Sequence, residues 1–436
     1  MLTDLRQTNI FSWKDMIFFL LILSIPFSVE YHFSSSLGTD LPDEPLMALV
    51  SFLFLVALVY RPSLLPPGFF RNPVILLLFI SIIWVVVTIL FSSDRLVSLK
   101  FLLAKSWYIG AFVLAASMVF SEPPKILITF RLLVFSMFIV VGIVLARHAF
   151  LGFQFATINK ALLPFFRNHV NYSALLVCLI PLAYAVHSLG SPSLKKIIGW
   201  LVLPVFLLAL FFSYSRGAWL ALPIGILAAW LASKRKLLIV YILSLLLLIA
   251  GLFWISSNER YLRFAPDFRT TIFHEDFKEH WVATYKLKDV STAERFYRWV
   301  SGVRMIPDRW ITGYGPNCFY EEYKPYAVPA FKTWVSDNKD HSTVHNYFLL
   351  TAIEQGIPGL ILLLLLFGAM IWQAEKNYQH AVNKFERVLA LTTASVLAML
   401  LLLNFLSDLV ETDKPGFIYF LCMALLVSRP SNHTQV

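Results

Sequence analysis

Long apolar runs separated by short polar stretches make up most of the chain. A helix that crosses a membrane needs about 20 mostly apolar residues, and runs of this kind predict about 12 such helices. The runs centre on Ile22, Phe54, Trp84, Phe112, Val140, Ile180, Phe206, Ile226, Leu246, Leu363, Val396 and Ala424. The pattern therefore predicts an all-α integral membrane protein that crosses the membrane many times.

One polar stretch is much longer than the others. Residues 256–344 join the ninth and tenth runs and are rich in arginine and aromatic residues, with no low-complexity segment. We therefore expect a folded cap and not a linker. Apolar positions at helical spacing predict a surface helix over Ala293–Met305 that ends before Pro307. The expected organisation is nine helices in residues 1–255, a loop or cap in 256–344, and three helices in 345–436.

Basic residues alternate between the short loops. Arg61, Lys195, Lys376 and Arg429 belong to loops that fall on one side of the predicted membrane, together with the N-terminal segment. Short cytoplasmic loops carry the excess of Lys and Arg in membrane proteins. Both termini are therefore predicted to be cytoplasmic, and the long loop to lie on the opposite side.

Composition narrows the class of protein further. Of the 436 residues, 58% are hydrophobic and 14% charged, whereas a soluble chain is about half apolar and a quarter charged. The three cysteines are far apart, which excludes a disulfide framework and a zinc-finger spacing. The net charge of +10 fits basic cytoplasmic loops and a site for anions, and does not indicate nucleic-acid binding.

The first candidate for chemistry is the stretch Ser213–Trp219, between two apolar runs. It contains Arg216 followed by Gly217, which permits a tight turn. A guanidinium at such a junction needs an anionic partner or a wet cavity, and its planar fork suits a phosphate or pyrophosphate. The alternative is an interfacial anchor that reaches lipid head groups.

The second candidate stretch begins the tenth run. His345 enters this run from the outer side, beside Asn346, and Glu354 follows further along. A neutral imidazole can take a proton from a sugar hydroxyl, so His345 is a candidate general base. Its alternative role is a hydrogen-bonding residue at a helix start. Glu354 either contributes to substrate binding or pairs with a basic group inside the bundle.

The third candidate stretch lies in the long loop. Arg295 and Trp299 stand four residues apart, so one face of a helix presents both. Arg295 is placed to grip phosphate while Trp299 packs on the bundle. Arg298 and Trp299 here, and Asn346 in the second stretch, are further candidates for substrate binding, although a position facing solvent or lipid suits Arg298 better.

A fourth stretch precedes the sixth run. Arg167, His169 and Asn171 place one cation and several hydrogen-bonding groups at its outer end, where they are candidates for substrate binding. An ordinary helix start capped by asparagine is the alternative.

Signals for metal and cofactor sites are missing from the sequence. There is no D-x-D pair at the outer face, no Walker motif and no H-E-x-x-H. His341 and His345 are four residues apart, but no third ligand is evident. We therefore expect neither a metal nor a cofactor, and an activated sugar phosphate would be bound by arginine.

These stretches together resemble the O-antigen ligase and polymerase superfamily of bacterial membrane glycosyltransferases. The resemblance rests on Ser213–Trp219, on Glu294–Trp299 with the following Pro307–Asn317, and on His345-Asn346 with Glu354–Gly359. The order of the motifs and the single long outer loop also agree with this family.

The resemblance implies a metal-independent enzyme of the GT-C type in the bacterial inner membrane, with its active site on the periplasmic face. The expected donor is a glycan on undecaprenyl pyrophosphate, and the expected acceptor is lipid A–core. The family's essential arginines match Arg216 and Arg295, and its catalytic histidine matches His345. The implied partners are this donor, this acceptor and membrane lipids.

Other functions stay open at this point. An O-antigen or exopolysaccharide polymerase, or a protein O-oligosaccharyltransferase, would share the same motifs. A transporter of polysaccharide or lipid is the main candidate of a different class, because its span count would be similar.

Overall fold

The computed structural model describes residues 12–34, 37–257, 290–329, 332 and 343–428. Nearly all of these residues are helical. The helices are α1 (Trp13–Ser24), α2 (Asp43–Tyr60), α3 (Pro73–Leu90), α4 (Arg95–Ile109), α5 (Ala116–Val119), α6 (Pro123–Phe150), α7 (Ile158–Leu162), α8 (His169–Leu189), α9 (Pro192–Ile197), α10 (Leu203–Phe212), α11 (Arg216–Ser233), α12 (Leu237–Ser256), α14 (Val290–Met305), α15 (Phe319–Glu322), α16 (Tyr347–Glu354), α17 (Gly356–Gln379), α18 (Lys384–Leu406) and α19 (Asp413–Val427).

Each of the twelve predicted apolar runs coincides with helix, but the count of twelve spans is not confirmed. Within the described residues, ten helices are long and apolar enough to cross a membrane. Two of them are continuous through a π-helical turn, at Gly110–Ala115 between α4 and α5 and at Ile198–Val202 between α9 and α10. The first and last runs form α1 and α19, which are shorter, with 12 and 15 residues. The protein is thus an all-α, multi-pass membrane protein.

A two-stranded antiparallel hairpin is an element that the sequence did not predict. Strands β1 (Val29–Ser34) and β2 (Leu37–Leu41) pair with Val29 opposite Leu41. The hairpin follows α1 after a 3-10 turn at Ile25–Phe27, so the predicted run from 16 to 29 is cut short as a helix. Its strand β2 contacts α2.

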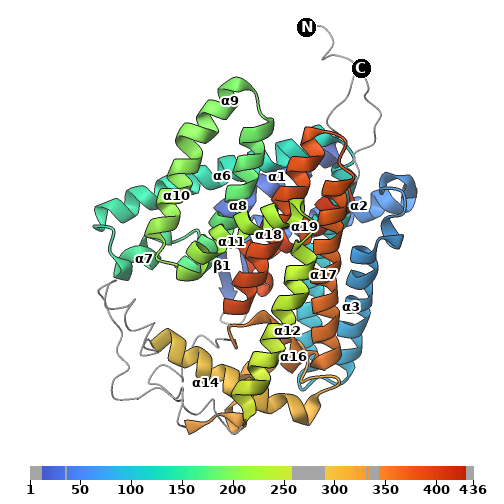
Figure 1. Cartoon of the computed structure of the whole chain (residues 1–436), viewed down its shortest axis with the longest axis vertical. Coiled ribbons are helices and arrows are strands. Elements are labelled where there is room, and N and C mark those ends of the chain that lie inside the picture. The colour runs from blue at the N-terminus through green and yellow to red at the C-terminus, as the bar shows by residue number, and fades with distance from the viewer. Residues whose placement is uncertain (1–11, 35–36, 258–289, 330–331, 333–342, 429–436) are drawn as a thin grey trace.

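The helices differ in how deeply they are buried in the bundle. In α8 and α18, 72% and 67% of the spanning residues are buried, compared with 6% in α12. A helix with apolar residues on every side and almost no protein contact belongs against lipid. The bundle is therefore built around α8 and α18, with α12 on its edge beside α17 (Figure 1).

The described residues of the long loop lie at one end of the bundle (Figure 1). The predicted surface helix is α14, and the predicted stop is a 3-10 turn at Ile306–Arg309. A separate small core holds the cap together, and it consists of Tyr297, Met305, Tyr314, Cys318, Phe319, Tyr323, Val344, Leu350 and Ile353. Figure 1 shows α14 at one end of the molecule and α9 at the other. Residues 258–289 and 333–342 of the predicted cap lie outside the described residues.

The contact between α11 and α18 fixes the position of the start of α11, which carries Arg216. The buried face of α11 is a row of small residues at helical spacing: Ala218, Ala221, Gly225, Ala228 and Ala232. Small residues let two helix backbones approach closely inside a membrane. At Gly225 the approach is tight, because an added Cβ would lie 2.2 Å from the Met399 Cε and 2.7 Å from the Ser395 Oγ.

We expect Gly225→Val to lower the stability of the protein by about 1–3 kcal/mol, because the side chain overfills this contact. Thermal unfolding in detergent, followed by tryptophan fluorescence, measures the change. Gly142→Val is the matched control, since Gly142 lies in α6 with no heavy atom within 4 Å of an added Cβ. Equal melting temperatures for the two variants would contradict the proposed packing.

Candidate active site

The turn between α10 and α11 holds Arg216 by contacts on both sides. The Trp219 Nε1–H donates a hydrogen bond of 2.6 Å to the Leu210 carbonyl, and its ring stacks on Phe211 with centroids 5.5 Å apart. The Tyr214 hydroxyl donates to the Phe153 carbonyl, and Tyr214 has a left-handed φ of 56°. Arg216 is consequently fixed as the first residue of α11.

The start of α11 is suited to bind an anion. The N-cap residue Ser215 makes no side-chain capping hydrogen bond in the described structure, and Arg216 is half-buried. The first-turn N–H groups of a helix lack helical acceptors and carry the positive end of the helix dipole. A guanidinium at the same point adds a planar pair of donors, so a phosphate oxygen would find several donors together.

Arg216 lies next to the end of α18. A Cβ on Gly217 would be 3.1 Å from the Leu406 Cδ1. Leu406 is the last residue of α18, and the chain beyond it forms one wall of the site. The close contact of α11 with α18 therefore brings the first arginine to this point.

Helix α14 docks on the same end of α18. The Trp299 Nε1–H donates to the Val344 carbonyl at 2.9 Å, and its ring packs against Phe405 with centroids 5.9 Å apart. Trp299 therefore contacts the bundle and the segment just before His345 at once.

Arg298 has a structural environment that the sequence did not predict. Its side chain is 0% exposed, so the expected position facing solvent or lipid is wrong. The Arg298 Nε forms an ion pair of 2.8 Å with Glu294, and the Nη1 donates to the Thr343 carbonyl at 3.3 Å. The guanidinium also lies 5.4 Å from the Tyr323 ring centre. Arg298 thus ties α14 to residues 343–344, because a buried charge needs a paired and hydrogen-bonded setting.

His345 stands at the junction that these contacts hold. It has a left-handed φ of 55°, and its backbone N–H donates to the Thr343 Oγ1 at 3.3 Å. The following Asn346 caps α16, since its Oδ1 accepts the Leu349 N–H at 2.9 Å. His345 does not begin a membrane span directly. The eight-residue α16 separates it from the span α17, with Gly356 at a φ of 72° between the two helices.

The charge state of His345 follows from its surroundings. Burial, and then the positive charges of Arg295 and Arg298, lower its pKa to about 4, while Glu294 opposes the shift. The imidazole is therefore neutral at pH 7. The influence of Arg295 also shows that its guanidinium faces the same region, although it lies on a different element.

The end of α18 contacts the chain on both sides of His345. The Thr343 Oγ1 donates to Asp408 at 2.8 Å, and the Tyr347 N–H donates to the Ser407 carbonyl at 3.1 Å. Burial raises the pKa of Asp408. Asp408 is outside the sequence motifs and was not among the predicted site residues. An acidic residue directly after an apolar run is nevertheless a sequence signal for a functional position.

Glu354 lies apart from this group. It is at the other end of α16, roughly 10 Å along the helix from Tyr347. Its side-chain Oε1 accepts the Phe319 N–H at 3.2 Å, and its carbonyl accepts the Gly315 N–H at 2.9 Å. Its observed contacts therefore hold the Gly313–Pro316 turn of the cap.

Arg167 and Asn171 line a different cavity, of about 170 Å³. Arg167 forms a two-pronged ion pair with Glu30 of β1, at 2.6 and 2.5 Å. The other polar groups of the lining are Asp40, Lys414 and Asn171. His169 does not line this cavity. Its backbone N–H and ring Nδ1 face the Asn159 Oδ1, and Asn168 caps α8, as expected for an ordinary helix start.

The structure therefore brings together the three elements that carry three of the sequence-predicted residues. Arg216, Arg295 and His345 come from α11, α14 and the segment before α16, and all three elements meet at the end of α18. Within the described part of the chain, no group of three or more His, Cys, Asp or Glu side chains is arranged to hold a metal ion. His341 lies outside that part.

Comparison with known proteins agrees with this arrangement. The model of a family described as O-antigen ligase matches residues 201–364, a range that includes all three of these residues. The chain is therefore similar to the O-antigen ligase superfamily. An O-antigen ligase of Salmonella typhimurium is 26% identical over 347 residues, which cover 77% of this chain and 79% of the relative. Both similarities support glycan transfer in O-antigen biosynthesis by a multi-pass membrane protein.

Proposed function

We propose that this protein transfers a glycan from undecaprenyl pyrophosphate to a hydroxyl group of lipid A–core, without a metal ion. The observation that supports this proposal is the meeting, at the end of α18, of the elements that carry two arginines and one neutral histidine. Transfer needs a base for the acceptor and positive charge for the leaving group, and these side chains supply both.

The proposed reaction is a displacement at the anomeric carbon. The acceptor hydroxyl loses its proton to the imidazole of His345 and forms the new glycosidic bond. The bond from the anomeric carbon to the pyrophosphate oxygen breaks, and the electron pair leaves with that oxygen. Arg216, with the first-turn amides of α11, and Arg295 stabilise the leaving pyrophosphate.

The donor changes the basicity of His345 in this mechanism. In the unliganded protein, burial and then the positive charges of Arg295 and Arg298 disfavour a proton on the imidazole. A bound pyrophosphate brings negative charge to Arg295 and offsets its effect. The pKa of His345 then rises from its lowered value, which makes it a better base near neutral pH.

We also propose the location and orientation of the enzyme. The basic loops support an inner-membrane protein with both termini in the cytoplasm and with α14, the arginines and His345 on the periplasmic side. The organisation is nine helices in residues 1–255, a periplasmic cap in 256–344 and three helices in 345–436. We infer that Arg167 and Asn171 contact sugar, because their cavity is lined by groups that hydrogen-bond hydroxyls.

The proposed activity is tested with purified protein in liposomes. The donor is a glycan on undecaprenyl pyrophosphate, the acceptor is lipid A–core, and the buffer contains excess chelator and no nucleotide. We expect glycosylated lipid A–core on a gel. A lengthened lipid-linked glycan would instead identify a polymerase. Movement of the donor across the bilayer without a new bond would identify a transporter. Loss of product in the presence of chelator would show that the enzyme requires a metal ion.

Arg216→Ala should lower kcat by about 10²–10³-fold, the usual cost of losing a donor to a developing anion. Arg216→Lys should restore little, because an ammonium group cannot make the planar two-pronged contact. Initial rates in the liposome assay measure this loss. The control is Arg61→Lys, at an exposed position after α2. Near-parental rates for Arg216→Lys would contradict the two-pronged contact.

The pH profiles should distinguish the free and donor-bound states of His345. With acceptor saturating, kcat/KM for the donor reports the enzyme without bound donor, and its acid limb should lie near pH 4, in accord with the lowered pKa. The acid limb of kcat should lie at higher pH, because the bound pyrophosphate offsets the arginine charges. Coincident limbs near pH 6.5 would show that the arginines do not control this base.

His345→Gln keeps a hydrogen-bonding side chain but no usable base. It should lower kcat by about 10²–10⁴-fold and remove both acid limbs. His380→Gln is the matched control, since His380 is exposed at the end of α17. If His345→Gln kept activity within a few-fold, another group would be the base.

A further inference from the structure

A second cavity of about 160 Å³ lies inside the bundle next to the proposed site. Its walls come from α2, α3, α4, α16, α17 and α19. It is smaller than the roughly 300–1,000 Å³ of a complete small-molecule site. Its size suits a segment of one chain and not a whole ligand.

The walls of this cavity are almost entirely apolar. Most lining residues are aliphatic or aromatic. Of the hydroxyl groups that line it, those of Ser81, Ser106 and Thr351 each donate to a carbonyl of their own helix: Ser81 to Leu77 at 2.8 Å, Ser106 to Leu103 at 2.6 Å and Thr351 to Tyr347 at 2.8 Å. The cavity therefore suits a hydrocarbon. Leu55 is 46% exposed and Ser106 is also exposed, so the cavity opens toward the outside of the bundle between α2 and α4.

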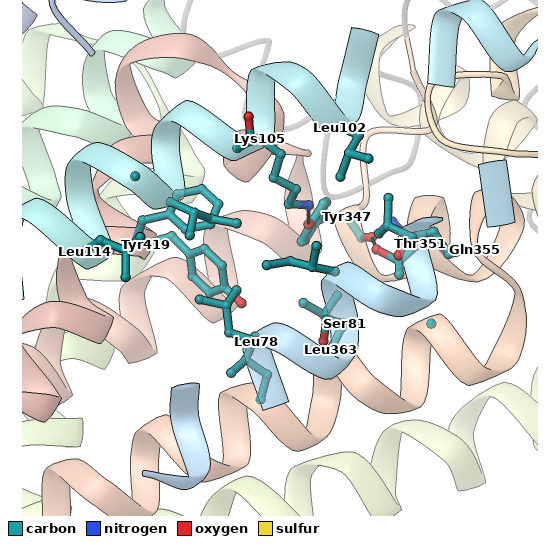
Figure 2. A pocket seen from close by; sticks show the side chains of 18 of the residues that line it. Leu78, Ser81, Leu102, Lys105, Leu114, Tyr347, Thr351, Gln355, Leu363 and Tyr419 are labelled. Carbon is teal, nitrogen blue, oxygen red and sulfur yellow. Dashed lines mark hydrogen bonds between the residues drawn. The ribbon is translucent and has the colours of Figure 1, made fainter. Parts of the chain in front are cut away.

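One end of the cavity carries a positive charge. The Lys105 Nζ donates to the Tyr347 hydroxyl at 3.3 Å and lies 4.7 Å from the Phe101 ring centre. Figure 2 shows Lys105 pointing into the cavity toward Tyr347, with Leu78, Ser81 and Leu363 on the facing walls. Lys105 lies within the span Arg95–Val119. An ionisable residue inside a span is costly and points to a functional contact.

The charged end of the cavity adjoins the proposed catalytic group. Tyr347 is two residues after His345, so their Cα atoms are at most about 7 Å apart. The cavity thus combines an apolar interior, an opening at the side of the bundle and a cation next to the site for pyrophosphate. A lipid whose single hydrocarbon chain begins directly at a phosphate group matches all three features.

We propose that this cavity holds the first isoprene units of the donor's polyprenyl chain, with Lys105 beside the phosphate that carries the chain. The proposal rests on the proposed function for the identity of the donor. It adds a lipid-binding residue and a lipid-binding cavity to the arginines and the histidine. Lys105 acts as a positioning residue, because it holds the lipid end of the donor while Arg216 and Arg295 bind the pyrophosphate.

The test is a binding experiment without acceptor and without turnover. Purified full-length protein is mixed with undecaprenyl monophosphate that carries a photoactivatable group in its second isoprene unit. Crosslink yield against concentration gives the affinity, and mass spectrometry locates the label. We expect labelling on α3, α4 and α16, and displacement by unlabelled undecaprenyl monophosphate but not by equal amounts of phosphatidylglycerol.

Two variants with matched controls test the charge of Lys105 and the volume of the cavity. Lys105→Met should weaken binding roughly tenfold to hundredfold, as for loss of a charged hydrogen bond, while Lys105→Arg should stay within about threefold. Lys100→Met, exposed on the same helix, should bind as the parent does. Ser81→Phe should block the cavity, whereas Ile80→Phe, on the exposed face of α3, should not.

The outcomes separate this proposal from the proposed function. Labelling elsewhere, equal displacement by phosphatidylglycerol, or unchanged binding in both Lys105→Met and Ser81→Phe would overturn the cavity proposal, even if glycan transfer is observed. Absence of transfer in the liposome assay would overturn the proposed function, while specific labelling that these two variants weaken would still support the cavity.

Discussion

The buried guanidinium of Arg298 is the contact on which the position of His345 depends. It is enclosed by its pair Glu294, the Thr343 carbonyl and the Tyr323 ring. A charge in this setting is strongly destabilising unless all its partners stay in place. Helix α14 and residues 343–344 must therefore move together, and Trp299 fixes both to the end of α18. Arg295 is carried by the same helix, so its distance to the histidine is set by this structural contact.

Burial, and then the charges of Arg295 and Arg298, lower the basicity of His345, and Arg295 is also a proposed ligand of the pyrophosphate. Positive charge next to an imidazole favours the neutral form, which is ready to accept a proton but has a low affinity for it. In the proposed mechanism the donor removes this conflict, because its negative charge arrives at the cations before the acceptor reacts. An acceptor that arrived first would meet a poor base, which favours an order of binding with the donor first.

The sequence predicted the membrane helices, and its motifs singled out Arg216, Arg295 and His345, whose elements meet at the end of α18. The membrane helices can be predicted because long apolar runs indicate burial in lipid. The resemblance to the family can be found because it depends on the order of the motifs, and neither needs a structure. The burial of Arg298 was missed because its spacing from Glu294 and Trp299 cannot distinguish a solvent-facing position from one under the cap. The hairpin β1–β2 was missed because its strands follow an apolar run without a break. Gly356 was a sequence signal for the break between α16 and α17. A residue with a side chain does not fit there, because an added Cβ would lie 2.0 Å from the Ile311 carbonyl oxygen.

Both junctions of the proposed site contain a non-glycine residue in the left-handed region, at Tyr214 and at His345. Such a conformation costs about 1–3 kcal/mol and persists only where other contacts hold it. Here those contacts are visible: the Tyr214 hydroxyl bonds to Phe153, and the His345 N–H bonds to Thr343. Each left-handed residue reverses the chain next to a helix start, which brings Arg216 to the first turn of α11 and His345 to the end of α18. A regular helix at either point would carry these side chains away from each other, so the strain at the two turns is what allows a membrane bundle to gather a base and its cations at one end.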